Sequence, residues 1–449
     1  MQPIKFIHTA DLHLGSPLKS LGQASEEIRD RLRDATFTAL KRIIDAALRH
    51  EVDFVLFAGD VYDLESRSIR ANRILAEELG RLNAAGISAF IIAGNHDPLG
   101  QIATEAFPLP ENITVFGSEE VEIAEVRRDE EVVARVLGQS YREKTESRQM
   151  IRYFTTPDTG VWNIGLLHTA LDPQGNRYVP CSVEDLKSKP DIHYWALGHI
   201  HQTRILSPGN PGIAYPGVPQ GRDIGESGVG GCLLVELTPQ NDPRFQFIPV
   251  SPILWEMREI VLENFEKQPE SLPDLAELIG RTDRAEMEYP DRVEADIPVI
   301  DGDDRGVEGT VIRWKLTGRG PIHEVIENDP RQAAEELERT LRERFAQQKP
   351  FRWTESVQFQ TGQPIQSLEE LAEEHELFRD IEKIRDDLRE SPELHERLLE
   401  QLGDIWSPDA DEEDPDPERF AVNKEVLEDL ISRATSRVVE ALVERRENL

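Results

Sequence analysis

The chain has 449 residues, of which 86 are Asp or Glu and 51 are Lys or Arg, so its formal net charge is -35. Hydrophobic residues make up 38% and recur in well-spaced runs to the end of the chain, which excludes a collagen-like, low-complexity or disordered protein. Since one hydrophobic core rarely grows past roughly 250 to 300 residues, the length predicts more than one domain.

Short apolar runs, each ending in small or polar residues, organise the first part of the chain. They predict buried strands at residues 5–14, 53–60, 88–97, 132–141, 161–169, 192–201 and 231–238. Apolar residues at helical spacing predict helices at residues 25–50 and 69–82, the second closed by Gly86. This order predicts an α/β domain over residues 1–250, with ligands bound beyond the carboxyl ends of its strands.

A smaller α+β capping domain is predicted over residues 251–362. Residues 255–262 and 311–317 have strand patterns, and a helix at residues 329–346 begins with the cap Asp329 followed by Pro330. Residues 363–449 are predicted to form a C-terminal helical region. Its elements, in order, are amphipathic helices at residues 367–390 (with a Ser367/Glu370 capping box) and 391–402, an acidic linker at 408–418, and a final helix at 423–447.

Cysteine content, hydropathy and charge distribution narrow the class of protein. Only Cys181 and Cys232 occur, without CxxC spacing, and no apolar stretch approaches the roughly 20 residues of a membrane helix. The first residues are expected to form a strand rather than a leader segment. We therefore expect a soluble cytoplasmic protein with no membrane contact.

Residues 1–250 carry 34 acidic and 25 basic residues, and residues 251–449 carry 52 acidic and 26 basic residues. The excess of negative charge repels nucleic acid unless a local positive site, a metal or a basic partner compensates. The simplest explanation of this excess is a solvated surface adapted to a salty cytoplasm.

Five short segments place residues that bind metals at the ends of predicted strands. They are Asp11-Leu12-His13, Gly59-Asp60, Gly94-Asn95-His96-Asp97, His168 and Gly198-His199-Ile200-His201. Each alone has an ordinary explanation, since a Gly-Asp pair is usually a turn and a lone histidine after an apolar run is usually a core residue. Together they would be costly to bury without a neutralising cation, so they predict a metal centre.

The ligand types narrow the choice of metal. Carboxylate, imidazole and amide oxygen ligands without thiolate suit Mn, Fe or Zn in an open site. In extended backbone, residues two apart point the same way, so Asp11 and His13 are expected to reach one ion together. Two ions about 3.5 to 4 Å apart need a bridging carboxylate, and Asp60 is the candidate.

In this order the five segments resemble the signature of the calcineurin-like metallophosphoesterases: D-x-H, GD, GNH followed by Asp or Glu, a later His, and GHxH. Residues 6–15 and 215–222 resemble the bacterial DNA-repair exonuclease branch of that family, of the SbcD and YhaO type. The resemblance implies a four-layer αββα sandwich that hydrolyses DNA phosphodiesters with two Mn2+ ions. It implies that His96 donates a proton to the leaving oxygen. The implied ligands are Asp11, His13, Asp60 and His201 for one ion, and Asp60, Asn95, His168 and His199 for the other.

The resemblance also implies a protein partner. In the resembling nucleases, C-terminal helices bind the base of a coiled coil on an SMC-like ATPase, so residues 367–449 are expected to dock such an ATPase. The alternative is that the apolar stripes of these helices pack on the chain's own core or on each other. Homodimer formation is left open. The rival functions are a phosphodiesterase or phosphatase for a small molecule, and a mainly regulatory subunit of an ATPase complex.

Four residues near the motifs have roles that the motifs themselves do not define. Asp97 either orients His96, as part of the catalytic apparatus, or hydrogen-bonds its own turn. Arg222 either contacts a phosphate or holds a turn. His8 is expected to pack in the core rather than bind a metal. Asp63 stands where eukaryotic and archaeal relatives often have a histidine, so a second catalytic histidine is absent at that position.

Overall fold

A computed structural model gives the fold of the chain. It describes residues 1–18, 26–64, 68–101, 108–156, 160–175, 177–282, 293–294, 297–300, 306–345, 348–363, 371–373, 375–391, 406–407, 420–421, 431, 434–435, 437–439 and 442–443. The chain divides into two compact units. The first contains Met1–Ile260, Ser271–Leu316 and Asp329–Gln360, and the second contains Val261–Glu270, Thr317–Asn328 and Thr361–Leu449.

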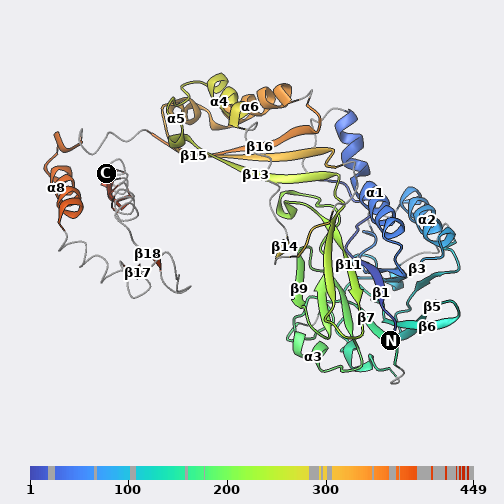
Figure 1. The fold of residues 1–449 in the computed structure, drawn as a ribbon. Helices are drawn as coiled ribbons and strands as arrows, with labels where there is room; N and C mark the ends of the chain where they lie inside the picture. The colour runs from blue at the N-terminus through green and yellow to red at the C-terminus, as the bar shows by residue number, and fades with distance from the viewer. Residues whose placement is uncertain are drawn as a thin grey trace. The chain divides into compact units, whose positions relative to one another are not determined.

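A six-stranded mixed sheet forms the first layer of strands in the first unit (Figure 1). Its order is β12 (Arg244–Pro249), β11 (Gly231–Leu237), β1 (Ile4–Thr9), β2 (Phe54–Ala58), β3 (Ser88–Ile92) and β4 (Ile113–Val115). From β1 to β4 the neighbouring strands are parallel, because α1 (Glu26–Arg49) and α2 (Ile69–Ala84) connect β1 to β2 and β2 to β3. The carboxyl ends of β1, β2 and β3 therefore lie at one edge of the sheet.

A seven-stranded mixed sheet forms the second layer. Its order is β14 (Val293–Glu294), β9 (Thr203–Ser207), β10 (Gly212–Tyr215), β8 (Tyr194–Gly198), β7 (Trp162–His168), β6 (Glu131–Gly138) and β5 (Glu122–Arg128). Strands β6, β7, β8 and β10 are parallel, whereas β5 and β9 each pair antiparallel with a neighbour.

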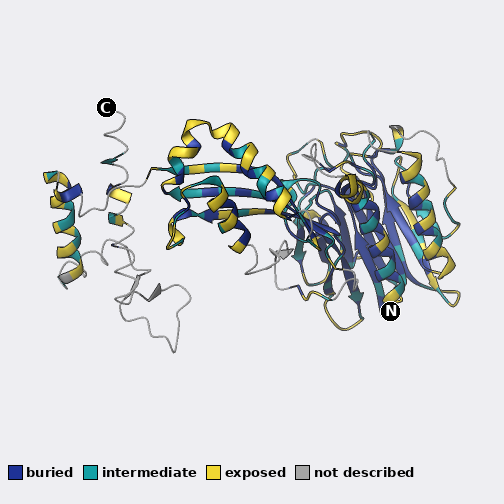
Figure 2. Ribbon diagram, turned by 90° about the horizontal axis from the view of Figure 1, so that it is seen from above, coloured by how far each residue is buried: buried dark blue, intermediate teal, exposed yellow. Residues whose placement is uncertain are grey.

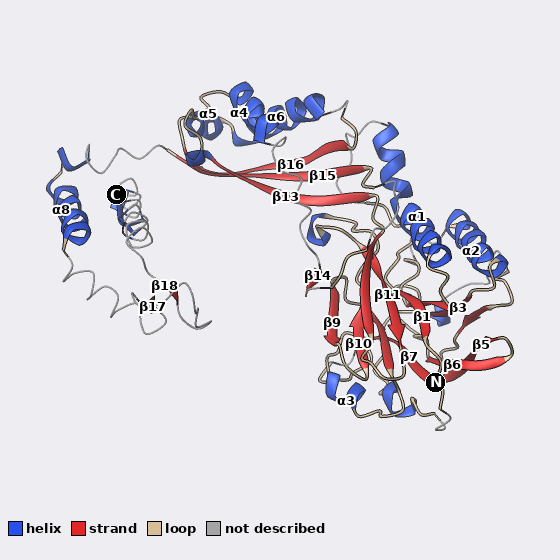
Figure 3. Cartoon of the chain, viewed as in Figure 1, coloured by secondary structure: helices blue, strands red, loops and turns tan. Residues whose placement is uncertain are grey.

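The two sheets face each other across one apolar core. Phe6, Phe54 and Phe90 from the first sheet share a fully or almost fully buried cluster with Leu166 and Tyr194 from the second. The strands of the first unit are accordingly coloured mainly as buried in Figure 2. Helices α1 and α2 lie on the outer face of the first sheet (Figure 3), and each buries one apolar side. On the outer face of the second, a further cluster includes residues of α3 (Val183–Lys187) and of a short 3-10 helix, Met150–Tyr153. This confirms the expected four-layer α/β arrangement.

A third, three-stranded sheet follows in the sequence. Its order is β13 (Ile253–Val261), β15 (Gly309–Arg319) and β16 (Phe351–Gly362). Helix α4 (Leu272–Thr282) packs against α6 (Pro330–Phe345). Within the first unit, Leu32 and Ala35 of α1 share a buried cluster with Trp255 and Val311 of this sheet. The domain boundaries expected at residues 250 and 362 stay predictions.

The second unit contains α5 (Ile322–Asn328) and α8 (Glu376–Glu390). Leu371, Phe378 and Val439 are buried in one cluster, so described residues of the C-terminal region pack on each other. Short pieces, β17 (Trp406–Ser407) and β18 (Phe420–Ala421), pair in parallel. The Ser367/Glu370 capping box, the linker at 408–418 and most of the helices expected at 391–402 and 423–447 lie outside the described residues. None of the helices in the described part of the chain is both long and apolar enough to span a bilayer.

Candidate metal centre

The five predicted segments meet at the carboxyl ends of strands from the two facing sheets. Three of them follow β1, β2 and β3, and the other two lie at the ends of β7 and β8. The backbone ties the segments together directly: the N–H of Asp11 donates to the Gly59 carbonyl at 3.0 Å, and the N–H of His13 donates to the Asp60 carbonyl at 3.0 Å. The parallel connection of the strands is therefore what gathers residues that lie far apart in sequence.

The backbone at these segments is not the extended strand that the spacing of Asp11 and His13 suggested. Asp11, His13, Asp60 and His199 have φ angles of 53°, 44°, 51° and 102°, a region that residues other than glycine rarely adopt. β1 ends at Thr9, so Asp11 and His13 lie in a loop whose hydrogen bonds hold this conformation. The expectation that an extended backbone aims both side chains was wrong, although the two still converge. Unfavourable φ angles of this kind concentrate at functional sites.

Glycine is required where the loops approach most closely. A Cβ atom at Gly94 would lie 2.3 Å from Asp60 Oδ1 and 2.8 Å from His168 Nε2. At Gly59, with φ of 93°, a Cβ would lie 2.4 Å from His168 Nδ1. Any side chain at either position would occupy the space in which the polar atoms of the site now lie.

Asp11, His13 and His201 form one cluster, with a ligand atom from each within 4.8 Å of the others. The backbone N–H of His199 donates to both oxygens of the buried Asp11 carboxylate, at 3.0 and 3.2 Å, and holds it in place. His13 donates Nδ1–H to Asp63 at 3.0 Å, and His201 donates Nδ1–H to Glu226 at 2.7 Å. Each imidazole therefore keeps a lone pair on Nε2. The Nε2 of His201 lies 4.0 Å from Asp11 Oδ1.

Asp60, Asn95, His168 and His199 form the neighbouring cluster. His168 donates Nδ1–H to the Ala58 carbonyl at 2.8 Å, which leaves a lone pair on Nε2 in the neutral ring. That Nε2 faces Asn95 Oδ1 at 3.0 Å and Asp60 Oδ2 at 3.4 Å, both of which are acceptors. Asn95 Oδ1 also lies 3.0 Å from His199 Nδ1. Acceptor atoms meet here, so a proton or a cation is needed between them.

Burial and neighbouring charges both shift the pKa values of the ionisable groups in these clusters, and at His168 they conflict. Burial raises the pKa of Asp11 and lowers that of His13, and burial together with the neighbouring His168 lowers the pKa of His199 to about 3. Burial would also lower the pKa of His168, but the Asp60 and Asp11 carboxylates raise it to about 9. A divalent cation would relieve this conflict, because it stabilises ionised carboxylates and neutral imidazoles at the same time.

The donor atoms fit divalent metal ions. The Nε2 of His13 is buried and has no hydrogen-bond partner among the described residues, and His13 shares the first cluster with Asp11 and His201. A buried nitrogen without a partner is costly, and a metal ligand bond would satisfy it. Cys181 and Cys232 are buried, and no group of three possible metal-binding residues in the described part of the chain includes either. The site therefore offers imidazole and oxygen ligands, as expected.

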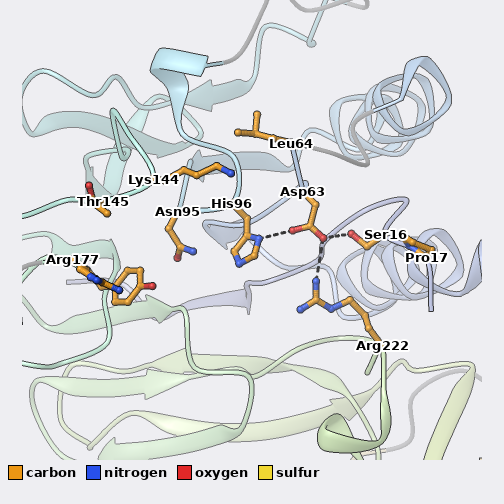
Figure 4. A pocket seen from close by; sticks show the side chains of 11 residues that line it. Ser16, Pro17, Asp63, Leu64, Asn95, His96, Lys144, Thr145, Arg177 and Arg222 are labelled. Carbon is orange, nitrogen blue, oxygen red and sulfur yellow. Dashed lines mark hydrogen bonds and ion pairs between the residues drawn. The ribbon is translucent and has the colours of Figure 1, made fainter. Parts of the chain in front are cut away.

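His96 lies beside these clusters on the wall of a pocket of about 570 Å³ (Figure 4). Its Nδ1 contacts Asp63 Oδ1 at 2.6 Å, and its side chain is 45% exposed. The hydrogen bond to Asp63 raises the pKa of His96 against the opposing effect of partial burial. Its backbone N–H donates to Asp60 Oδ1 at 2.8 Å. The ring is therefore oriented by one carboxylate while its loop is fixed to another.

Asp97 has the second of the two roles considered for it. Its carboxylate accepts hydrogen bonds from the backbone N–H groups of Gly94 at 2.7 Å, Val61 at 2.8 Å and Tyr62 at 3.2 Å. The side chain is thus used in holding two loops together, and the carboxylate that contacts the His96 ring is that of Asp63. Burial, followed by the negative charge of Asp60, raises the pKa of Asp97 to about 7. The expectation that Asp97 orients His96 is corrected accordingly.

Two carboxylates hydrogen-bond to histidines of the site. The sequence does not reveal either carboxylate as such a partner. Asp63 contacts both His13 and His96, and Glu226 contacts His201. Arg222 donates to both carboxylates. In the sequence Asp63 stands out only for the histidine it replaces, and no local pattern marks Glu226. His8 is fully buried, with Tyr194 and Leu197 as its hydrogen-bond partners, as a core residue should be.

Comparison with known proteins agrees with this geometry. Residues 4–203 match the calcineurin-like phosphoesterase family. The chain is 38% identical to the uncharacterized metallophosphoesterase YhaO of Bacillus subtilis over 256 residues, which cover 56% of this chain and 62% of YhaO. Over 220 residues it is 28% identical to the DNA double-strand break repair protein Mre11 of Methanocaldococcus jannaschii, covering 47% of this chain and 55% of that protein.

A second Mre11, from Archaeoglobus fulgidus, is 27% identical over 308 residues, covering 63% of this chain and 66% of the relative. The matches thus span 55% to 66% of the length of these three relatives. The matched family, the two facing sheets and the clustered ligand residues agree with one another. Residues 4–203 therefore have the fold and the clustered ligand residues of a calcineurin-like phosphoesterase.

Proposed function

We propose that the chain is a metal-dependent phosphodiesterase that cleaves DNA, as an exonuclease or endonuclease in DNA repair. The observation that carries the proposal is the buried Nε2 of His13, which has no hydrogen-bond partner in the described part of the chain. His13 clusters with Asp11 and His201, next to a pocket lined by His96. The similarity to two proteins named for DNA double-strand break repair supports DNA as the substrate.

The proposed ligands divide between two ions. Asp11, His13, Asp60 and His201 would hold the first, and Asp60, Asn95, His168 and His199 would hold the second. These donors suit Mn2+, which is the metal we propose. When bound, such a pair of divalent ions lowers the pKa of a water molecule and stabilises the charge that develops on the phosphodiester.

His96 is proposed as the proton donor to the leaving oxygen. Because Asp63 accepts the Nδ1–H of the ring, the other ring nitrogen remains for the substrate. The same hydrogen bond raises the pKa of His96, which keeps a larger share of the ring protonated near neutral pH. A positioned donor of this kind typically accelerates a reaction by about 10² to 10⁴.

Local positive charge in the pocket supports a polyanionic substrate despite the net charge of -35. Lys144 and Arg177 line the pocket, and neither forms an ion pair with any residue that the structure describes. Arg222 also lines it, but Asp63 and Glu226 already occupy its terminal nitrogens. We propose that Lys144 and Arg177 contact phosphates that flank the scissile bond.

The pocket volume favours one alternative, a phosphodiesterase for a small molecule. A pocket of about 570 Å³ lies within the range that accommodates small ligands. Purified protein with Mn2+ should be assayed on single-stranded, hairpin and duplex DNA, and on bis-p-nitrophenyl phosphate. Cleavage of DNA and of the small diester supports the proposal, and cleavage of the small diester alone supports the alternative. Metal-loaded protein that cleaves neither would refute both.

We further propose that residues 367–449 dock an SMC-like ATPase. In the described part of this region, Phe378 and Ile381 pack in a cluster with Val439, which satisfies part of the apolar stripe internally. Leu377 and Ile384 of α8 are more than half exposed and remain for a partner. Deleting residues 367–449 should abolish co-purification with the ATPase but preserve Mn2+-dependent diester hydrolysis. Unchanged complex formation would refute the docking.

A further inference from the structure

Two histidines of the first cluster are each held from behind by a carboxylate. His13 donates Nδ1–H to Asp63 at 3.0 Å, and His201 donates Nδ1–H to Glu226 at 2.7 Å. A carboxylate on Nδ1 fixes the tautomer, orients the ring and makes the opposite nitrogen a better metal ligand. Both histidines belong to the cluster that includes Asp11.

Arg222 connects the two carboxylates. One terminal nitrogen donates to Asp63 Oδ2 at 3.1 Å (Figure 4). The other donates to Glu226 Oε1 at 3.3 Å. The backbone N–H of Arg222 also donates to Glu226 Oε2 at 2.7 Å. The three side chains are only 14% to 18% exposed, so their charges are poorly screened by solvent. Asp63 is further fixed by the hydroxyl of Ser16.

We propose that Arg222 and Glu226 are positioning residues that determine the affinity of the first ion. This rests on the proposed two-metal function. Arg222 spans two carboxylates with one rigid guanidinium, so it holds His13 and His201 in a common orientation toward Asp11. It also brings one positive charge within hydrogen-bond distance of both carboxylates, which offsets their like charge.

The second cluster does not share this support. His168 is oriented by the backbone carbonyl of Ala58, and His199 contacts Asn95 and the ring of Tyr178. Within the described part of the chain, neither imidazole hydrogen-bonds to the arginine or to its two carboxylates. Removing Arg222 or Glu226 should therefore weaken the binding of the first ion and leave the binding of the second ion unchanged.

Glu226→Ala is a cleaner test than a change at Asp63. Asp63 also contacts His96, so its loss would disturb the proposed proton donor, whereas Glu226 contacts the ligand His201. Mn2+ binding to the full chain is measured by calorimetry with chelator competition, and bound metal is counted by elemental analysis. Wild type should bind two ions. Glu226→Ala should keep one unchanged site and weaken the other by about 10-fold to 100-fold, the usual effect of losing such a partner. Glu226→Gln, which keeps an oxygen acceptor, should lose less.

Glu355→Ala is the matched control. Glu355 is a buried carboxylate paired with Arg313 at 2.8 Å on β15 and β16, outside the ligand clusters. Its loss should leave both Mn2+ sites unchanged. Wild-type protein that binds no divalent ion would refute the proposed function itself. Two wild-type sites that Glu226→Ala weakens equally, or not at all, would refute only the selective role of Glu226.

Arg222→Lys and Arg222→Ala separate positioning from substrate contact. Lysine keeps the charge but cannot span two carboxylates as a planar fork, so both variants should weaken the first ion, alanine more than lysine. If Arg222→Ala left both Mn2+ affinities unchanged and only raised the KM for a phosphodiester, Arg222 would be a phosphate ligand. That result would overturn the positioning role.

Discussion

His8 makes a defined contribution to the response of this fold to acid. Its fully buried ring contacts the Tyr194 hydroxyl through Nδ1 at 2.9 Å and the Leu197 carbonyl through Nε2 at 3.1 Å. Because a carbonyl only accepts, the neutral ring carries its proton on Nε2 and accepts from the tyrosine on Nδ1. A second proton would place an uncompensated charge in the core. Burial accordingly lowers the pKa of His8 from 6.5 to about 3.

The lowered pKa of His8 determines how the free energy of unfolding changes with pH. Below pH 6.5 the unfolded state binds more protons at His8 than the folded state does, so stability is lost as the pH falls. One pH unit corresponds to about 1.4 kcal/mol, so His8 alone should reduce the free energy of unfolding by about 2 kcal/mol at pH 5. This loss is insensitive to the exact folded pKa, provided that value lies well below 5. It is a substantial part of the roughly 5 to 15 kcal/mol that stabilises a typical domain.

Urea unfolding of wild type and His8→Gln, with chelator present, would measure the effect. Between pH 7.5 and 5, the variant should lose about 2 kcal/mol less than wild type, whatever its stability at pH 7.5. Titration of the metal ligands contributes to both proteins and cancels in the difference. His50→Gln is the control, because His50 is only partly buried and should change the pH dependence less. Equal pH dependence of wild type and His8→Gln would refute the reasoning.

The remaining predictions concern the metal centre and the pocket. Asp60→Ala should remove the shared ligand, abolish hydrolysis and leave a folded protein, so elemental analysis that still finds two tightly bound ions would contradict the assignment. His96→Asn should lower turnover by about 10² to 10⁴ while metal stoichiometry stays unchanged, and metal loss would instead identify His96 as a ligand. Lys144→Ala and Arg177→Ala should each reduce kcat/KM for DNA by about tenfold with little change for bis-p-nitrophenyl phosphate, since each removes one charged contact. Equal losses on both substrates would argue against flanking-phosphate contacts.

Much of the fold was predictable because its signals are local. Apolar runs located β6, β7 and β11 within a few residues, and the cap at Asp329 and Pro330 located α6. These strands are mostly buried, so their sequences are largely apolar. β5 was missed, because its polar sequence lies at the edge of the second sheet with little buried surface. The pattern also does not indicate β4, β9, β10, β12 or β16.

The sequence alone determined which residues would form the ligand clusters, because each motif is short and follows its own strand. The tertiary structure decided how those residues are supported. Arg222 and Asp63 are separated by 159 positions and meet only because loops from both sheets converge, so no local spacing could predict their pairing. Asp97 likewise holds the backbone of a loop that is remote in sequence. Residue type and spacing determine which ligands are available, whereas long-range packing determines which carboxylate orients each histidine.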